Sequence, residues 1–200
     1  MDVRMVASPN ENEQVSTREK LILAGLQELN ENGIQNFSTR RVASICGVSC
    51  AAPYKHFENT QKFISEILGY INGIYFKEQQ EVLAKYADSD CKTQLLQVNL
   101  HYIRFLVKYP AFHSVITQDF SQMDPEYRAL REQLSAGTYS LVKQYCDSVG
   151  APEEVQKRRT FIVRSIIYGA ALFFLNRQVE YNEENMKMVE SVLEHEMDFF

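Results

Sequence analysis

Apolar residues recur every three or four positions along most of the chain from residue 17 onward. This is the spacing of amphipathic helices. In the first such segment, Ile22, Leu26 and Leu29 fall on one helical face, and Gly33 follows as the expected C-terminal cap. The pattern therefore predicts a helix over residues 17–32.

The longest predicted helix begins at Asn59, a good N-cap, and runs to about residue 87. Spacing and capping residues predict the remaining helices over 39–46, 50–56, 92–108, 110–120, 125–149, 152–178 and 183–197. The alternation of apolar and polar residues that is typical of strands does not occur, and residues 1–15 have the polar composition of a flexible tail. The expected fold is all-α with about nine helices.

Composition is consistent with this fold and excludes several classes of protein. The 200 residues include 45% apolar and 24% charged residues, with only 8 Gly and 5 Pro, which argues against fibrous, disordered or disulfide-scaffold chains. The longest strongly apolar stretch, residues 166–175, is half the length that a membrane-spanning helix needs. No signal-peptide pattern opens the chain, so we expect a cytoplasmic protein whose four cysteines stay reduced.

The formal net charge of −5 hides a local basic segment. Between residues 37 and 62, Arg40, Arg41, Lys55 and Lys62 oppose one acid, Glu58, which gives this segment a charge of +3. A basic patch of this kind can hold phosphates although the rest of the protein is acidic.

The same segment contains the signature of a helix-turn-helix, two short helices joined by a tight turn, over residues 38–57. Ala43 is small where the second helix must cross the first, and Gly47 suits a turn with positive φ. Val48 is placed to fill the angle between the helices, and Ser49 to cap the second one.

Gly47-Val48-Ser49 followed by Tyr54-Lys55-His56-Phe57, with Val42-Ala43 before them and a capped long helix after them, closely resembles the tetracycline-repressor (TetR) family. These are dimeric bacterial transcription regulators. The likeness covers Thr17 to about Leu68, and the helix-Pro-helix junction over residues 102–112 resembles that of many family ligand-binding domains. It implies a DNA-binding domain over residues 16–58 and a ligand-binding and dimerisation domain over 59–200.

The resemblance also implies roles for individual residues. Ser38 and Arg40 would meet DNA at the start of the first motif helix, the second motif helix would enter the major groove, and Tyr54 and His56 would contact phosphates. The family commonly has Lys where this chain has Thr60, and Lys62 is the expected substitute. The candidate DNA-binding residues are Ser38, Arg40, Arg41, Ser49, Cys50, Ala51, Tyr54, Lys55, His56, Thr60 and Lys62. Pro53 lies in the first turn of the second helix, where the lost amide is expected to be tolerated.

The last two predicted helices carry apolar residues on more than one face, which favours self-association. In the family these helices form a four-helix dimer interface. The expected interface residues are Ile166, Ala170, Phe174, Met186, Val189, Leu193 and Met197. A homodimer would then read two half-sites of a palindromic operator about one DNA turn apart.

Many aromatic residues lie between the motif and this interface, together with a few polar groups. Such a set forms either the core or the wall of a pocket for a small apolar or aromatic effector. The candidate ligand-binding residues are Tyr102, Phe105, Phe112, His113, Ile116, Phe120, Tyr139, Phe161, Arg164 and Tyr168. On this hypothesis the effector acts through the long helix that follows the motif and releases a repressor from its double-stranded operator.

Two alternative functions belong to other classes of protein. An enzyme is disfavoured because the sequence has no Gly-rich phosphate loop and no paired Glu-x-x-His motif. No metal or other cofactor is expected, since Cys46, Cys50 and His56 lack a fourth ligand at a known spacing, although a thiol switch at Cys50 is conceivable. A helical interaction or ligand-binding module without DNA-binding activity is the second alternative, and the basic segment argues against it.

Overall fold

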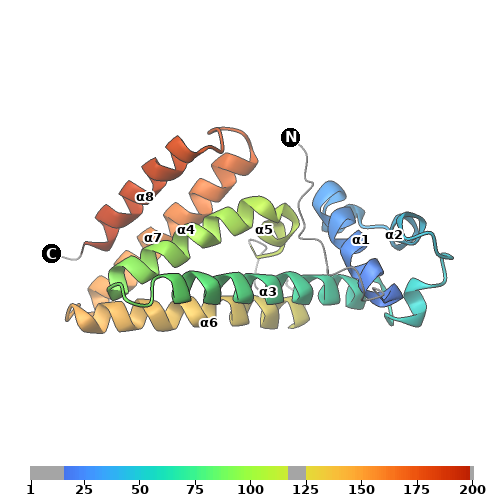
Figure 1. Cartoon of the computed structure of the whole chain (residues 1–200), viewed down its shortest axis with the longest axis horizontal. Coiled ribbons are helices and arrows are strands. Elements are labelled where there is room, and N and C mark those ends of the chain that lie inside the picture. Colours follow the sequence, from blue (N-terminus) through green and yellow to red (C-terminus); the bar gives the residue numbers. More distant parts are fainter. Residues whose placement is uncertain (1–15, 117–124, 199–200) are drawn as a thin grey trace. The chain divides into compact units, whose positions relative to one another are not determined.

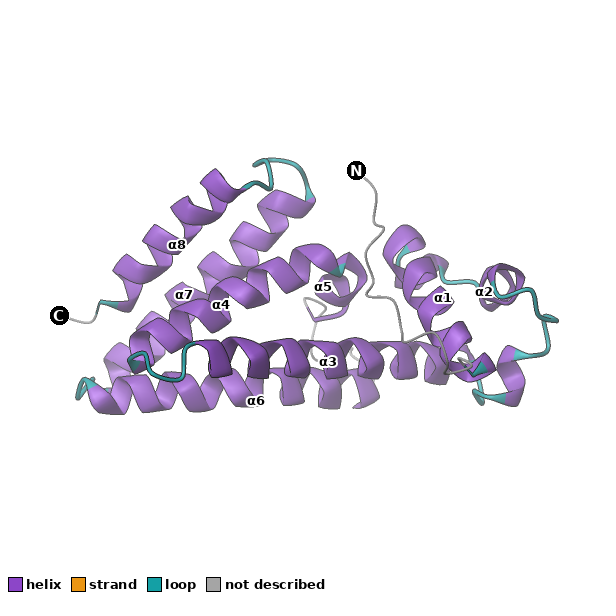
Figure 2. Cartoon of the chain, viewed as in Figure 1, coloured by secondary structure: helices purple, strands orange, loops and turns teal. Residues whose placement is uncertain are grey.

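The structure is a computed structural model of the chain and describes residues 16–116 and 125–198. Within these residues all regular structure is helical (Figures 1 and 2). The elements are α1 (Thr17–Asn32), η1 (Ile34–Asn36), α2 (Thr39–Ile45), η2 (Pro53–Lys55), α3 (Thr60–Lys85), α4 (Cys91–Lys108), α5 (Pro110–Ile116), α6 (Pro125–Ser148), α7 (Glu153–Leu175) and α8 (Glu183–Met197). The all-α prediction is confirmed, with eight α-helices and two short 3-10 helices in the described ranges.

Helix boundaries follow the capping residues that the sequence offers. The side chain of Asn59 accepts a hydrogen bond from the Lys62 amide at 2.8 Å, and that of Asn182 accepts one from the Asn185 amide at 2.9 Å. Gly33 ends α1 with φ 71°. These caps satisfy amides and carbonyls that a helix terminus otherwise leaves without partners.

The C-terminal end of α7 differs from the prediction. The helix stops at Leu175, three residues short of the expected residue 178, and Arg177 takes a left-handed conformation with φ 56°. The amide of Gln178 then donates to the Phe173 carbonyl at 2.9 Å and that of Arg177 to Phe174 at 3.1 Å. This is a Schellman turn, in which a non-glycine residue occupies the position that glycine usually fills.

The chain divides into two compact units, one ending at Ile67 and the other beginning at Leu68. In the first unit α1 packs on α2, and Leu21, Leu29, Val42 and Ala43 are almost completely buried. The predicted domain boundary, after residue 58, falls before the end of this unit at Ile67. The difference arises because the first turns of α3 belong to the core of the first unit. At Gly25 of α1 an added Cβ would lie 2.5 Å from the Cδ1 atom of Ile67, so glycine permits the close approach of α1 and α3.

The second unit is organised around α4, which packs against α5, α6, α7 and α8 (Figure 1). Tyr75 of α3 is almost fully buried, and its ring lies 5.0 Å from that of Phe105 and 5.3 Å from that of Tyr102, both on α4. Burial raises the pKa of Tyr75 to about 12. In the described ranges, no helix combines the length and the hydropathy that crossing a membrane requires.

Candidate nucleic-acid interface and effector cavity

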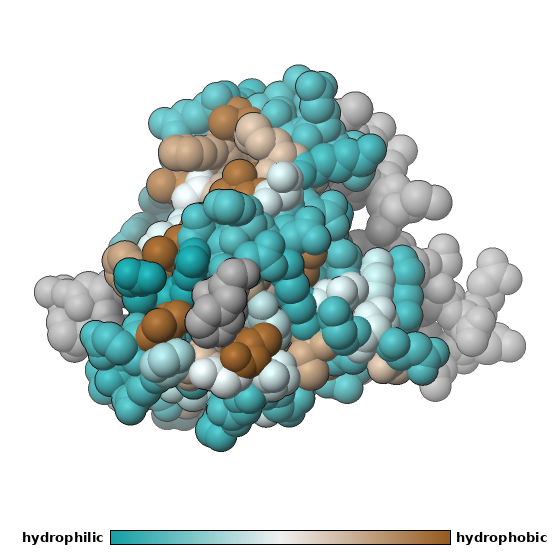
Figure 3. Space-filling model, turned by 90° about the vertical axis from the view of Figure 1, so that its left-hand side faces the viewer, coloured by the Kyte–Doolittle hydropathy of each residue, from teal (hydrophilic) through white to brown (hydrophobic). Residues whose placement is uncertain are grey.

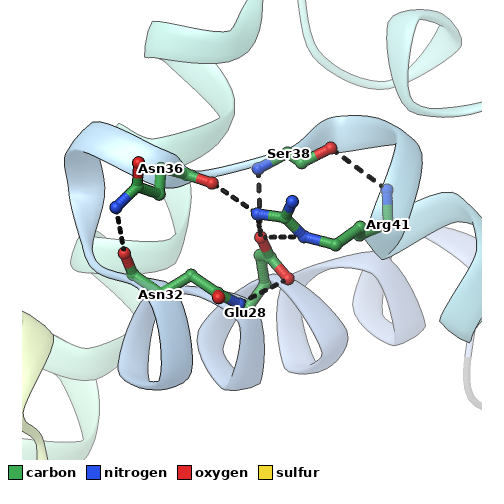
Figure 4. Close-up of polar contacts among 5 residues, drawn as sticks. All are labelled: Glu28, Asn32, Asn36, Ser38 and Arg41. Atoms are coloured by element: carbon green, nitrogen blue, oxygen red, sulfur yellow. Dashed lines mark hydrogen bonds and ion pairs between the residues drawn. The ribbon is translucent and has the colours of Figure 1, made fainter.

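The start of α2 is held by a buried carboxylate from α1 (Figure 4). Glu28 is 1% exposed and accepts hydrogen bonds from the Ser38 amide at 3.2 Å and from Nε of Arg41 at 2.8 Å. The Asn32 side chain donates to its second oxygen at 3.2 Å. Ser38 in turn caps α2, its hydroxyl accepting from the Arg41 amide at 3.3 Å. This network fixes the first motif helix on α1.

The turn after α2 has the predicted geometry. Gly47 has φ 65°, and its amide donates to the Ser44 carbonyl at 3.1 Å. The amide of Val48 reaches back to the carbonyl of Ala43 at 3.0 Å, and Ala43 is fully buried against α1. The chain therefore leaves α2 in the sharp turn that a helix-turn-helix requires.

The predicted second motif helix over residues 50–56 needs correction. Only Pro53–Lys55 is helical, as the 3-10 helix η2, and a turn precedes it in which the Ala52 amide donates to the Ser49 carbonyl at 2.9 Å. Pro53 has no amide with which to continue an α-helical ladder, so the turn tightens. The segment still ends firmly: the Phe57 amide donates to the Pro53 carbonyl at 2.9 Å, and the Phe57 ring stacks on Phe63 of α3 at 4.0 Å.

Tyr54 projects from this segment and is held at its hydroxyl. The residue is 54% exposed, and a hydrogen bond of 3.1 Å joins its hydroxyl to that of Thr39, the first residue of α2. Hydrogen bonds with Thr39 and Thr60 and the charge of Arg40 lower the pKa of Tyr54. The phenol therefore bridges the two halves of the motif while its ring stays accessible.

Most of the predicted DNA-binding residues lie on the surface of the first unit. The exposed ones are Arg40, Arg41, Ser49, Cys50, Ala51, Tyr54, Lys55 and His56, whereas Ser38, Thr60 and Lys62 are half-buried. The hydroxyl of Ser38 is already used as a cap. We call one surface of the first unit the motif face. It consists of Arg40, Ser49, Cys50, Ala51, Tyr54, Lys55 and His56, which lie at the start of α2 or within a few residues of η2.

Arg41 does not fit its predicted role. Its guanidinium group is committed to the Glu28 carboxylate and to the carbonyl of Asn36. The ion pair cancels one of the positive charges counted in the basic segment, because Glu28 lies outside residues 37–62 in the sequence. Arg41 therefore positions α2, and Arg40 and Lys55 remain exposed cations of the motif face.

Two residues that position the motif face were missed. Thr39 gave no signal beyond following an N-cap, and its contact with Tyr54 spans 15 residues. Glu28 occupies an otherwise apolar face of α1, and a charged residue at an inward position is the signal that would have found it.

The predicted ligand-binding residues divide into three groups. Tyr102, Tyr139, Arg164 and Tyr168 line a cavity of about 110 Å³ in the second unit. Three others belong to the core or to the outer surface of that unit and not to this cavity wall: Phe105 and Phe112 are 1% exposed, and Phe161 is 74% exposed.

The third group of candidates consists of His113, Ile116 and Phe120. His113 is buried, and burial lowers its pKa. The side chain of Ile116 and all of Phe120 lie outside the described residues.

The predicted dimer interface also needs correction. Met186, Leu193 and Met197 are at most 2% exposed, because this face of α8 packs inside the second unit. Ile166, Ala170, Phe174 and Val189 instead line an almost wholly apolar groove of about 510 Å³ between α7 and α8. Phe161, Phe173, Met188 and Val192 also line the groove and are 45–74% exposed. Figure 3 shows apolar residues among hydrophilic ones toward the top of the view, where α7 and α8 lie in Figure 1.

No known protein-family profile matches the sequence, and no curated protein matches it. Solved structures do match. A transcriptional regulator from Rhodococcus sp. superposes with a TM-score of 0.70 at 17% identity, over 91% of this chain and 96% of its own. A TetR family transcription regulator from Marinobacter aquaeolei has a TM-score of 0.66 at 18% identity, over 90% and 94%. The chain has the TetR-family fold.

A third solved structure with this fold contains a bound ligand. The transcriptional regulator FadR from Bacillus subtilis, solved in complex with stearoyl-CoA, superposes with a TM-score of 0.66 at 16% identity, over 90% of this chain and 98% of its own. These superpositions show a shared fold, a helix-turn-helix unit followed by a helical unit, as the resemblance in the motif predicted.

Proposed function

We propose that the protein is a dimeric, sequence-specific DNA-binding transcriptional regulator. The observation that carries the proposal is the motif face. A positive-φ turn at Gly47 is followed by an exposed segment that bears Ser49, Tyr54, Lys55 and His56, all of them hydrogen-bonding or charged groups. Hydroxyl and imidazole groups suit phosphate oxygens, and Lys suits both phosphates and guanine edges.

The charge of the motif face supports DNA as the partner. Arg40 and Lys55 are exposed there, in a protein with a formal net charge of −5. A local positive surface attracts the phosphate backbone although the whole chain is acidic. Because Glu28 neutralises Arg41, we expect fewer cations to contribute to DNA affinity than the four that residues 37–62 contain.

The groove between α7 and α8 supports self-association. Exposed Phe161, Phe173, Met188 and Val192 gather in one apolar patch of the second unit. Contiguous apolar surface of this kind marks an interaction site. A second copy seated there would give the protein two motif faces for the half-sites of a palindromic operator.

Repression with release by an effector is the finer part of the proposal. The cavity lined by Tyr102, Tyr139 and Tyr168 offers a place for a small molecule. FadR from Bacillus subtilis, a regulator with a similar fold, was solved in complex with stearoyl-CoA. An effector would lower DNA affinity if it binds more tightly to a conformation that does not fit the operator.

Salt titration tests DNA binding directly. We expect the full chain to bind a labelled mixed-sequence duplex and to lose affinity steeply between about 50 and 200 mM salt, as phosphate neutralisation requires. Lys55→Gln should lower the slope of log affinity against log salt by about 1. Lys187→Gln removes an equal charge from the exposed side of α8 and should leave the slope unchanged. A folded sample that binds no duplex at low salt would refute the proposal.

A further inference from the structure

The cavity in the second unit is lined by residues of four helices, α4, α6, α7 and α8. Its apolar wall includes Leu95, Val142, Val163 and Ile167. A volume of about 110 Å³ is close to that of a cavity that holds a single aromatic ring. The wall thus sets the size and the apolar character of an occupant.

Two buried hydrogen-bond donors on this wall have no partner among the residues that the structure describes. Asn99 is 1% exposed, and its side-chain Nδ2 has no acceptor within hydrogen-bond distance. Nε of Arg159 is likewise buried without a partner, although the same guanidinium donates through Nη1 to Glu196 at 2.6 Å. Buried donors are almost always satisfied, so the pair points to an acceptor other than the described part of the chain.

The charge on the wall selects the kind of acceptor. Arg159 and Glu196 neutralise each other as an ion pair. Arg164, which lines the same cavity, adds a positive charge, and its guanidinium carbon lies 6.0 Å from the centre of the Tyr168 ring. The wall therefore combines free donors with a net positive charge, which suits an anionic acceptor.

The tyrosines on the wall reinforce this preference. Burial and the neighbouring Tyr168 hold the pKa of Tyr102 well above its ordinary value, so Tyr102 stays protonated at neutral pH. A neutral phenol adds no negative charge that would oppose an anion.

The cavity also has an entrance. Tyr139, Val142, Thr160, Arg164 and Tyr168 line it and also line an open groove of about 570 Å³ between α6 and α7. Arg164 is exposed and belongs to the lining of both the groove and the cavity. An occupant can enter from this groove with its anionic group facing the donors.

We propose that this cavity binds a small organic carboxylate with a ring-sized apolar body, held by Asn99, Arg159 and Arg164. Two carboxylate oxygens offer enough lone pairs to satisfy both orphan donors at once. In naming the chemical class of the effector, the proposal rests on the proposed function. Binding of the carboxylate is measured without DNA, so carboxylate binding and DNA binding can fail separately.

Calorimetry on the full chain tests the proposal with benzoate, phenylacetate and hexanoate, each beside its uncharged amide. We expect at least one acid to bind and its amide to bind about tenfold more weakly or worse, since hydrogen bonds to charged groups contribute more than neutral ones. If no acid binds, or if acid and amide bind equally, the proposal is wrong.

Variants connect the binding to the named residues. Asn99→Leu and Arg164→Gln should each weaken the acid about tenfold. Lys143→Gln, which removes the same charge from the groove but not from the cavity wall, should leave it within about twofold. Arg164 is exposed, so its variant tests the proposal even if Asn99→Leu does not fold. Unchanged binding in Arg164→Gln would overturn the assignment. An acid that binds without changing DNA affinity would leave the site intact and refute its role as effector.

Discussion

The carboxylate of Glu28 and the guanidinium of Arg41 form an ion pair that joins α1 to α2 across 13 residues of sequence. Glu28 is buried, whereas the Arg41 side chain is half exposed. A buried carboxylate needs its partners because water cannot replace them. The pair therefore fixes the orientation of the first motif helix, and with it the place of Tyr54, which is hydrogen-bonded to that helix.

Glu28→Gln should destabilise the first unit. The substitution keeps the size of the side chain but removes the charge that binds Arg41, and we expect the free energy of unfolding to fall by about 1–3 kcal/mol. Hydrogen exchange at the amides of α1 and α2 measures the loss. Glu31→Gln on the exposed side of the same helix should change it by less than about 0.5 kcal/mol. Equal protection in Glu28→Gln and the parent chain would contradict this account.

Thr39→Val should weaken DNA binding although Thr39 is itself buried. Valine keeps the shape of threonine but removes the hydroxyl that holds Tyr54 at 3.1 Å. We expect an affinity loss of about three- to tenfold, corresponding to one hydrogen bond, and a similar loss for Tyr54→Phe. Fluorescence anisotropy with a labelled operator measures both variants, and sedimentation checks that they remain dimers. The hypothesis fails if both variants bind as tightly as the parent chain.

Met188→Glu should convert the dimer into a monomer. Met188 is 52% exposed on the α7–α8 groove, and a carboxylate there would be buried without a partner in a symmetric interface. Sedimentation velocity at micromolar concentration should show a single chain. Lys187→Glu, one residue away and outside the groove lining, is the matched control and should remain dimeric. A dimeric Met188→Glu variant would show that the interface lies elsewhere.

Most of the fold could be predicted from local signals. Gly33, Asn59 and Asn182 mark helix ends through backbone conformation or side-chain caps, which are properties of the residue and its neighbours. The motif turn at Gly47 was predictable for the same reason.

Relations between distant segments could not be predicted in this way. The apolar spacing of α8 shows that Met186 and Leu193 share a face but not whether that face meets the same chain or a partner. The pairing of Arg41 with Glu28 depends on how α1 crosses α2. Pro53 is a local signal, but its place in a first turn predicts a tolerated substitution, whereas the structure has only a 3-10 helix in this segment.

Acid should destabilise the second unit through the buried His113 and the half-buried His101. Burial lowers the pKa of His101 and of His113 below the ordinary value of 6.5, and the nearby Glu78, 3.6 Å from His101, opposes this only in part. Because the folded state binds protons less readily than the unfolded chain, stability is present above about pH 6.5 and is lost as the pH falls through the lowered values.

The free energy of unfolding should therefore drop between about pH 7 and pH 5.5. Chemical denaturation followed by circular dichroism measures it at each pH. The double variant His101→Gln with His113→Gln should show a smaller drop. An equal drop in parent and variant would assign the pH dependence to other groups.

On the proposed function, the motif face of the first unit recognises DNA and a dimer presents two such faces. Selection of bound duplexes from a random double-stranded pool by the full chain tests both parts at once. The account predicts enrichment of a palindrome with half-sites about one helical turn, ~34 Å, or slightly more apart, and loss of that enrichment in Lys55→Ala. Recovery of no enriched sequence by a folded, dimeric sample, or recovery of the same palindrome by Lys55→Ala, would contradict it.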